Sequence, residues 1–190
     1  MRQPAGKVRI IAGSHRGRMV GVPPGDVSRP TGARVREALF SILKHHEPGV
    51  SDSTILDACA GSGALGFEAL SRGAEHVTFF ETDRDAQNTI SQTALELGFS
   101  DQTTVKRGDV RRPAPSTSGS CGIIFLDPPY SSTIAATAPA ALVSAGWIGS
   151  ESLLVIETRR TAPVLPETGF SEIDSRNYGE TSLFLMQVTV

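Results

Sequence analysis

Alternation between two kinds of segment is the feature that most constrains how this chain folds. From Thr54 onward, short apolar runs alternate with longer segments whose apolar residues recur at helical spacing. Repeated strand–helix–strand units favour an α/β fold with a mostly parallel sheet covered by helices on both faces, followed here by two antiparallel strands. The seven expected strands cover residues 54–57, 76–81, 103–107, 121–126, 153–158, 170–175 and 182–188, and the expected helices cover 65–72, 83–97 and 133–144.

The residues before this region form a smaller extension. Two short apolar runs, 8–12 and 18–22, flank the sequence Gly-Ser-His-Arg-Gly, which predicts a β-hairpin with a basic tip. A helix is expected over 32–45, where apolar residues again recur at helical spacing. We therefore divide the chain into an extension, residues 1–48, and a main α/β unit, residues 49–190, which together make effectively a single domain.

The extension is strongly basic. Residues 1–44 contain nine Lys or Arg side chains and two acids, although the whole chain of 190 residues has a formal net charge of -2. Such asymmetry is typical of a basic arm that meets a polyanion, and it also fits a solvated basic face that has no partner.

Composition excludes several other classes of protein. Hydrophobic residues make up 39% and charged residues 20% of the chain, which argues against disorder. The apolar runs are too short to cross a bilayer, and the first residues do not have the pattern of a secretory signal. The two cysteines, Cys59 and Cys121, make neither a disulfide framework nor a metal-binding pattern. We expect a cytoplasmic monomer that holds no metal and contacts no membrane.

A glycine-rich loop between the first main strand and its helix indicates a ligand site. Gly61, Gly63 and Gly66 let the backbone approach a ligand closely, and the following helix would present free N–H groups. The same spacing also matches the fingerprint of dinucleotide-binding proteins, and Glu81 lies where their ribose-binding acid is expected. A nicotinamide-dependent oxidoreductase is therefore one interpretation.

Acids at successive strand ends favour a cationic ligand instead. In a doubly wound sheet the carboxyl ends of the strands meet at the ligand crevice. A carboxylate four residues before the first glycine would repel a pyrophosphate, whereas S-adenosylmethionine carries an ammonium and a sulfonium group. Helix capping explains one of these acids, Asp83, but not the whole set. The acids are Asp57, Glu81, Asp83, Asp109 and Asp127.

The sequence Asp127-Pro-Pro-Tyr130 follows the buried strand predicted over 121–126. The prolines stiffen the turn and leave carbonyl groups to face a ligand. An exocyclic amino group on a base needs acceptors such as the Asp127 carboxylate and the Pro128 carbonyl, which would direct the nitrogen lone pair at a methyl donor. Tyr130 would stack on the base, a contact worth about 1–3 kcal/mol.

These motifs, in this order, resemble class I S-adenosylmethionine-dependent methyltransferases with a Rossmann-like fold. One branch is similar over essentially the whole chain: the RsmD-type small-subunit rRNA guanine-N2 methyltransferases. The basic extension contributes most to that likeness. The matching segments are VRIIAG at 8–13, RGR at 16–18, RPT at 29–31, RVREALF at 34–40, GSGALGFEALSRG at 61–73 and YG at 178–179.

The resemblance implies a role for particular residues. Glu81 or Asp83 would hold the ribose hydroxyls, and Asp109 with Val110 would hold the adenine. The implied catalytic residues are Asp127, Pro128 and Tyr130. The implied cofactor-binding residues are Asp57, Ala58, Gly61, Gly63, Glu81, Asp83, Asp109 and Val110. The implied RNA-binding residues are Arg9, Arg16, Arg18, Arg29, Arg34 and Arg36, in a block expected to approach both RNA phosphates and the mouth of the active site.

The implied reaction is methyl transfer from S-adenosylmethionine to N2 of a guanine in 16S rRNA, in an assembled or assembling small-subunit particle, with S-adenosylhomocysteine as product. A DNA adenine-N6 methyltransferase remains an alternative, because Asp-Pro-Pro-Tyr suits that chemistry equally. Such enzymes usually carry a large target-recognition region, and the segment after Tyr130 is short. A noncatalytic RNA-binding factor with a vestigial cofactor pocket is a third alternative to consider.

Overall fold

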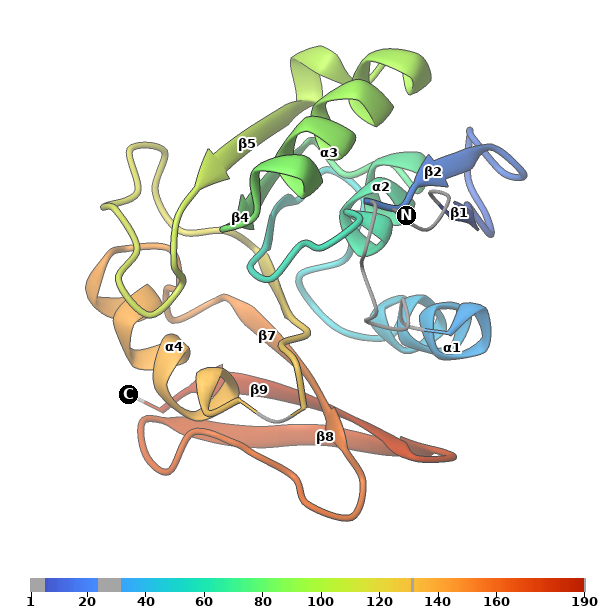
Figure 1. The fold of residues 1–190 in the computed structure, drawn as a ribbon. Helices are drawn as coiled ribbons and strands as arrows, with labels where there is room; N and C mark the ends of the chain where they lie inside the picture. Colours follow the sequence, from blue (N-terminus) through green and yellow to red (C-terminus); the bar gives the residue numbers. More distant parts are fainter. Residues whose placement is uncertain (1–5, 24–31, 131, 190) are drawn as a thin grey trace.

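The computed structural model describes residues 6–23, 32–130 and 132–189, and Arg29 therefore lies outside the described residues. The chain begins with a small hairpin and one helix, and then alternates strands with helices (Figure 1). The strands are β1 Lys7–Arg9, β2 Met19–Gly21, β3 Thr54–Asp57, β4 His76–Glu81, β5 Thr103–Arg107, β6 Ile123–Leu126, β7 Leu153–Arg159, β8 Phe170–Tyr178 and β9 Thr181–Val188. The helices are α1 Ala33–Leu43, α2 Ala64–Ser71, α3 Arg84–Leu97 and α4 Ile134–Ser144, with a 3-10 turn at Ser100–Gln102.

Seven strands form the main sheet, in the order β5-β4-β3-β6-β7-β9-β8. The strands from β5 to β7 are parallel, and β9 then pairs antiparallel with both β7 and β8. This confirms the predicted mostly parallel seven-stranded sheet. The order reverses between β3 and β6, so the loops after these two strands flank the position where open α/β sheets bind ligands.

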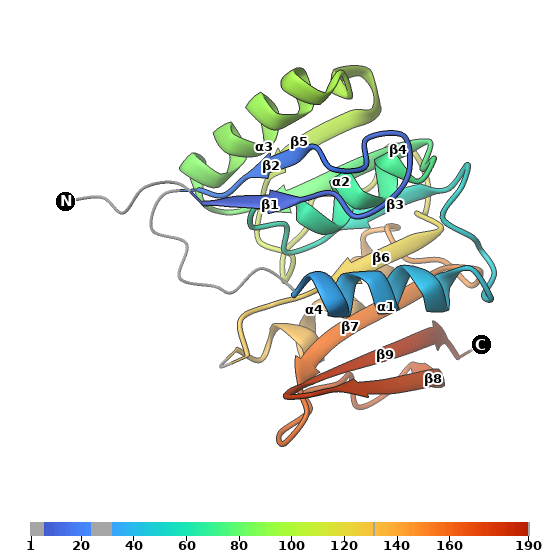
Figure 2. The ribbon, with the colours of Figure 1, turned by 90° about the vertical axis from the view of Figure 1, so that its right-hand side faces the viewer.

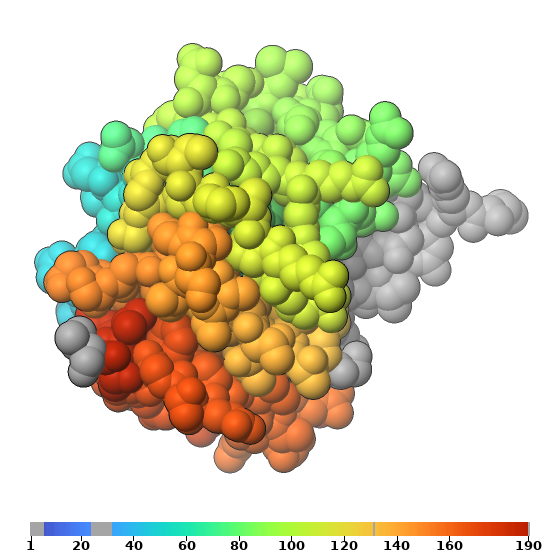
Figure 3. Space-filling view, turned by 90° about the vertical axis from the view of Figure 1, so that its left-hand side faces the viewer, coloured from blue at the N-terminus to red at the C-terminus, as the bar shows by residue number. Residues whose placement is uncertain are grey.

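Helices cover both faces of the main sheet. One face carries α1, α2 and α3, whose apolar residues pack against alternate strand positions such as Ile55, Phe79 and Phe125. The other face carries α4 and the loop that follows β5, packed around Trp147. Figure 3 shows that second face, with the loop lying above α4 and the last strands. Strand residues on both faces are buried, as an interior parallel sheet requires.

The hairpin is shorter than the sequence predicts, because part of it bonds to helix α2 instead of to itself. The amides of Ile11 and Ala12 donate to the two carboxylate oxygens of Glu68, at 2.7 and 3.0 Å. Farther along, Ser14 N–H donates to the Ser71 carbonyl at 2.7 Å. These contacts bring the hairpin against α2 and α3 (Figure 2), and Ile10 and Val20 become part of the main core.

The other helices and strands begin and end at, or within a few residues of, the positions expected from the sequence. Strands β3, β4 and β5 have the predicted bounds, and Asp83 caps α3 by accepting from Ala86 N–H at 2.8 Å. At the C-terminal hairpin, Tyr178 belongs to β8 rather than to the turn, which falls at Gly179 with φ +60°. Among the described residues, no helix has the length and apolar character needed to cross a membrane.

Candidate active site

The glycine loop connects β3 to α2 in a backbone conformation that side chains disfavour. Gly61 has φ +52°, and Gly63, with φ +77°, stands at the N-cap of α2. Gly66 serves a different purpose, since a Cβ there would lie 2.3 Å from Phe79 Cε1. Because Gly66 has no Cβ, α2 can lie close against β4. The loop therefore keeps its backbone, rather than side chains, at the crevice.

Asp57 ends β3 and is 2% exposed. Its Oδ2 accepts a hydrogen bond from Gly66 N–H at 3.1 Å, which ties the strand end to the first turn of α2. The pKa of Asp57 is raised to about 7, chiefly by burial and also by the negative charges of Asp127 and Glu81, while the Gly66 hydrogen bond acts in the opposite direction. A positive charge beside this carboxylate would stabilise its ionised form.

Glu81 ends β4 and turns its carboxylate toward the glycine loop. Its Oε2 accepts from Gly61 N–H at 2.8 Å, and its Oε1 accepts from the amides of Thr82 and Asp83 at 2.7 and 2.9 Å. Asp83 has its own task as the N-cap of α3. Of the two acids suggested for ribose binding, Glu81 is the one in direct contact with the loop.

Asp109 lies beyond β5 and is already paired. Its carboxylate accepts from the Arg111 guanidinium at 2.6 Å and from Arg111 N–H at 2.9 Å. The Arg111 hydrogen bonds hold the pKa of Asp109 below its ordinary value. Val110, next to it, is buried in the core beneath α4. An adenine amine at Asp109 would therefore share this carboxylate with Arg111 or displace it.

Asp127 and Tyr130 lie at the end of β6, the neighbour of β3. Pro128 is buried, whereas the Tyr130 side chain is 41% exposed. The Tyr130 hydroxyl donates to Glu157 Oε1 at 3.0 Å and lies 3.0 Å from Thr181 Oγ1. Burial raises the pKa of Tyr130 to about 12, so the hydroxyl remains protonated near neutral pH.

Four of the predicted acids converge on the glycine loop. Cys59, in that loop, has its pKa raised first by burial and then by the negative charges of all four acids. Their convergence, next to a loop that keeps side chains away, fits an organic cation with ribose hydroxyls and an amine. Among the described residues there is no cluster of acids, histidines and cysteines arranged to hold a metal ion. The four acids are Asp57, Asp127, Glu81 and Asp109.

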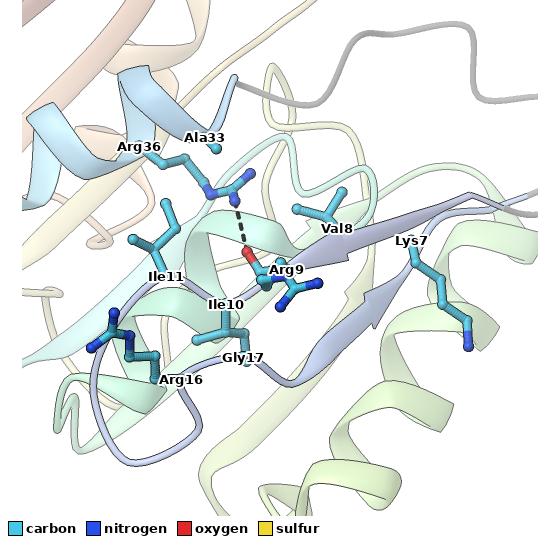
Figure 4. A pocket seen from close by; sticks show the side chains of 9 residues that line it. All are labelled: Lys7, Val8, Arg9, Ile10, Ile11, Arg16, Gly17, Ala33 and Arg36. Atoms are coloured by element: carbon cyan, nitrogen blue, oxygen red, sulfur yellow. Dashed lines mark hydrogen bonds between the residues drawn. The ribbon is translucent and has the colours of Figure 1, made fainter.

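A second feature is a cationic cavity of about 520 Å³ between the hairpin and the start of α1. Figure 4 shows Lys7, Arg9 and Arg16 extending from the hairpin and Arg36 extending from α1. Of the described residues that line it, four are basic and none is acidic. Arg9 and Arg16 were expected to contact RNA, whereas Lys7 was missed because a single lysine beside a short strand gives no sequence signal.

The remaining predicted RNA-binding residues fall into different environments. Arg36 is 2% exposed and donates to the Arg9 carbonyl at 2.9 Å. Its guanidinium thus joins α1 to the hairpin while lining the cavity, and the expected phosphate contact of Arg36 stays a prediction. Arg18 is exposed but bonds to the Glu96 carbonyl on α3, away from the cavity. Arg34 is exposed in the first turn of α1. Helix α1 begins on the side of the sheet where the parallel strands end (Figure 2).

Comparison with known proteins gives a consistent result. The family described as "Conserved hypothetical protein 95" matches residues 8–187. The ribosomal RNA small subunit methyltransferase D of Haemophilus influenzae is 35% identical over 185 residues, covering 96% of this chain and 94% of that protein. The Escherichia coli protein of the same name is 38% identical over 161 residues, covering 81% and 76%.

Solved structures agree with the sequence relatives. The Escherichia coli protein yhhF superposes with a TM-score of 0.79 at 32% identity, covering 97% of this chain and 99% of that one. A Haemophilus influenzae methylase gives a TM-score of 0.78, also at 32% identity. With a matching family over nearly the whole chain, relatives above 30% identity and an acid-lined glycine loop, the chain belongs to the family of the small-subunit rRNA methyltransferases D.

Proposed function

We propose that this protein transfers a methyl group from S-adenosylmethionine to N2 of a guanine in 16S rRNA, and that it acts on an assembled or assembling small-subunit particle. The observation that supports the proposal most is the convergence of Asp57, Glu81, Asp109 and Asp127 on the glycine loop. The relatives named as rRNA methyltransferases favour RNA over the alternative of DNA adenine.

One set of residues would bind the cofactor and another would bind the target base. Asp57 and the loop from Ala58 to Gly63 would hold the methionine part, Glu81 the ribose hydroxyls, and Asp109 with Val110 the adenine. When bound, the cofactor supplies an electrophilic methyl group on a sulfonium. These contacts would fix that group at the crevice between β3 and β6, which are adjacent strands.

Asp127 and Pro128 would prepare the guanine nitrogen. The exocyclic amine is a weak nucleophile, because its lone pair is delocalised into the ring. Hydrogen bonds from its two N–H groups to the Asp127 carboxylate and the Pro128 carbonyl would turn the lone pair toward the methyl group. N2 would gain the methyl carbon while S-adenosylhomocysteine leaves, and the surplus N2 proton would pass to the Asp127 carboxylate and then to water. Asp127 would stabilise the positive charge that develops on nitrogen.

The cationic cavity supports a path for the RNA backbone. Lys7, Arg9 and Arg16 surround it, and Ala33 at the start of α1 lies at its edge. The hairpin tip bonds to Ser71, at the end of α2 that is farthest from the glycine loop. Phosphates near the hairpin tip would therefore belong to nucleotides some distance from the target guanine, while Arg34 would contact phosphates nearer to it. An RNA substrate must then be longer than a few nucleotides to reach both the cationic cavity and the active site.

A two-stage experiment tests this proposal. Binding of tritiated S-adenosylmethionine is measured first, and then transfer to free 16S rRNA and to small-subunit particles. We expect binding, transfer to the particle, and N2-methylguanosine as the product identified by mass spectrometry. Cofactor binding without transfer to any RNA would contradict the substrate assignment, and N6-methyladenine in DNA would favour the alternative enzyme. Tight NADH binding in a fluorescence titration would favour an oxidoreductase.

A further inference from the structure

We propose that Glu157 is a positioning residue that acts through the Tyr130 hydroxyl to hold the Tyr130 ring where the target base stacks. This inference rests on the proposed function and adds a residue to it. The contact joins β7 to the turn after β6: the Tyr130 hydroxyl donates to Glu157 Oε1 at 3.0 Å.

Glu157 is unusual for its place in the fold. It follows Leu153–Ile156, a run of four buried apolar residues in the interior of the sheet, and is itself only 7% exposed. A buried carboxylate costs stability unless hydrogen bonds compensate it, and an apolar residue would pack there more favourably. A buried acid at this position therefore depends on hydrogen-bond donors around it. The Tyr130 hydroxyl gives this acid a donor in the candidate active site.

Strand register explains why the acid lies at this place. Leu126 of β6 pairs with Ile156 of β7, so the next residues, Asp127 and Glu157, are neighbours at the carboxyl edge of the sheet. The chain turns at Pro128 and Pro129 and brings the Tyr130 hydroxyl back to Glu157. The two neighbouring carboxylates therefore have different tasks, Asp127 toward the base and Glu157 toward the tyrosine.

The Tyr130 ring is restrained at more than one point. Thr181 Oγ1, on β9, lies 3.0 Å from the same hydroxyl. The Arg159 guanidinium lies 5.8 Å from the ring centroid, within the range of a cation–π contact. The side chain nevertheless remains 41% exposed. A ring fixed at its hydroxyl end, with part of its surface open, is suited to receive a flat base, and a base that stacks on a fixed ring requires no further ordering of the tyrosine.

A double-mutant cycle tests the inference, with tritium transfer to the small-subunit substrate as readout. The single variants are Tyr130→Phe, which keeps the ring but loses the hydroxyl, and Glu157→Leu, which keeps the bulk but loses the acceptor. We expect each to lower kcat/KM for RNA by about tenfold, the loss typical of a hydrogen bond to a charged group. The double variant should be no worse than the weaker single variant, and S-adenosylmethionine affinity should stay within about twofold.

Further variants separate this role from a general loss of folding. Glu157→Gln keeps an acceptor oxygen and should retain most of the activity. Thr181→Val should lower activity in the wild-type background and have no effect in the Tyr130→Phe background. Glu172→Gln, on the exposed strand β8, is the matched control and should behave as wild type.

Three results would overturn the inference. Losses that multiply in the double variant would show that Glu157 acts independently of the Tyr130 hydroxyl. An equal loss of cofactor affinity and turnover in Glu157→Leu, together with an inactive Glu157→Gln, would assign the residue to the fold or to the cofactor. Absence of wild-type transfer to any RNA would overturn the proposed function as well, whereas wild-type transfer with multiplying losses overturns this inference alone.

Discussion

The Glu81 carboxylate accepts a hydrogen bond from the Gly61 amide at 2.8 Å, although the two residues are 20 positions apart in the chain. The contact joins the end of β4 to the loop after β3, so the acid and the glycine loop are placed against each other before any ligand arrives. The Thr82 amide holds the other carboxylate oxygen. The hydroxyl groups of a bound ribose would donate to the Glu81 carboxylate in place of the Gly61 amide. The Glu81 side chain would not have to change its conformation.

Asp57 should make cofactor binding depend on pH. Because burial raises its pKa to about 7, the ligand-free carboxyl is largely protonated below that pH. A bound ammonium group favours the ionised form, so binding must release this proton. We expect the affinity for S-adenosylmethionine to weaken as pH falls below 7, by up to about tenfold per pH unit. Calorimetry in two buffers of different ionisation enthalpy would detect the released proton.

The same carboxyl should affect stability without ligand. The folded pKa, about 7, lies above the ordinary value of 3.8, so the folded state retains a proton that the unfolded state has lost between these values. The free energy of unfolding should therefore fall as pH rises from about 4 to 7, by at most about 1.4 kcal/mol per pH unit from this group. Asp57→Asn should abolish both dependences, and an unchanged profile in that variant would assign them to another group.

Asp127→Asn should separate chemistry from cofactor binding. The amide keeps the size of the side chain but loses the charge that would stabilise the reacting nitrogen. We expect methyl transfer to slow by about 10²–10³-fold, with cofactor affinity nearly unchanged. Single-turnover transfer and equilibrium dialysis measure the two quantities separately. Equal losses in both would mean that Asp127 supports the fold of the crevice.

Arg111→Ala should strengthen cofactor binding. Arg111 pairs with the Asp109 carboxylate that is expected to accept from the adenine amine, so its removal leaves the acid available. A few-fold lower Kd is expected, because the ion pair is exposed and water already weakens it. Arg112→Ala is the control, since it removes a nearby positive charge of the same kind. A weaker Kd for Arg111→Ala would show instead that the arginine supports the ligand.

The cationic cavity should give a salt-dependent contribution to RNA affinity. Alanine at Lys7, Arg9 or Arg16 should weaken binding and reduce the slope of log affinity against log salt by about one for each phosphate that is no longer neutralised. The same is expected for Arg34. Arg176→Ala, on strand β8, is the control. A weaker affinity with an unchanged slope would point to altered folding rather than to phosphates left without a cationic partner.

Glu68→Ala should release the hairpin from α2. Glu68 is fully buried, accepts from the Ile11 and Ala12 amides, and pairs with Arg72 at 2.8 Å. Removing one partner of a buried pair typically costs about 3–5 kcal/mol. We expect lower thermal stability and faster amide hydrogen exchange over the hairpin, whereas exposed Glu75→Ala should change little. Unchanged exchange at the hairpin would contradict this role for Glu68.

The sequence predicts the local features of this fold well, because their causes lie in neighbouring residues. Strands β3 to β5 have the expected bounds, since residues that end a strand follow or close each of them: Asp57, Glu81 and the glycine after Arg107. The Asp83 cap and the Gly98 helix end likewise depend on residues within a few positions. The acids at the strand ends could be placed at one edge, because parallel strands share that edge.

Contacts between distant segments were beyond such reasoning. The attachment of the hairpin to Glu68, and of Tyr130 to Glu157, depends on how elements pack rather than on local pattern. Arg36 is different, because a signal was present: it occupies the same helical stripe as Leu39, Phe40 and Leu43, all of them buried. A basic residue at such a position joins elements within the protein, whereas the exposed Arg34, two positions before it, faces solvent.

Helix α2 connects the glycine loop to the binding place of the hairpin tip. Its eight residues begin at the Gly63 N-cap of the glycine loop and end at Ser71, where the hairpin tip is bound. At about 1.5 Å per residue the helix is about 12 Å long. It therefore serves as a spacer of fixed length between the loop and the basic tip. One inserted residue would rotate its far end by about 100°, moving the tip relative to the loop while leaving both locally intact.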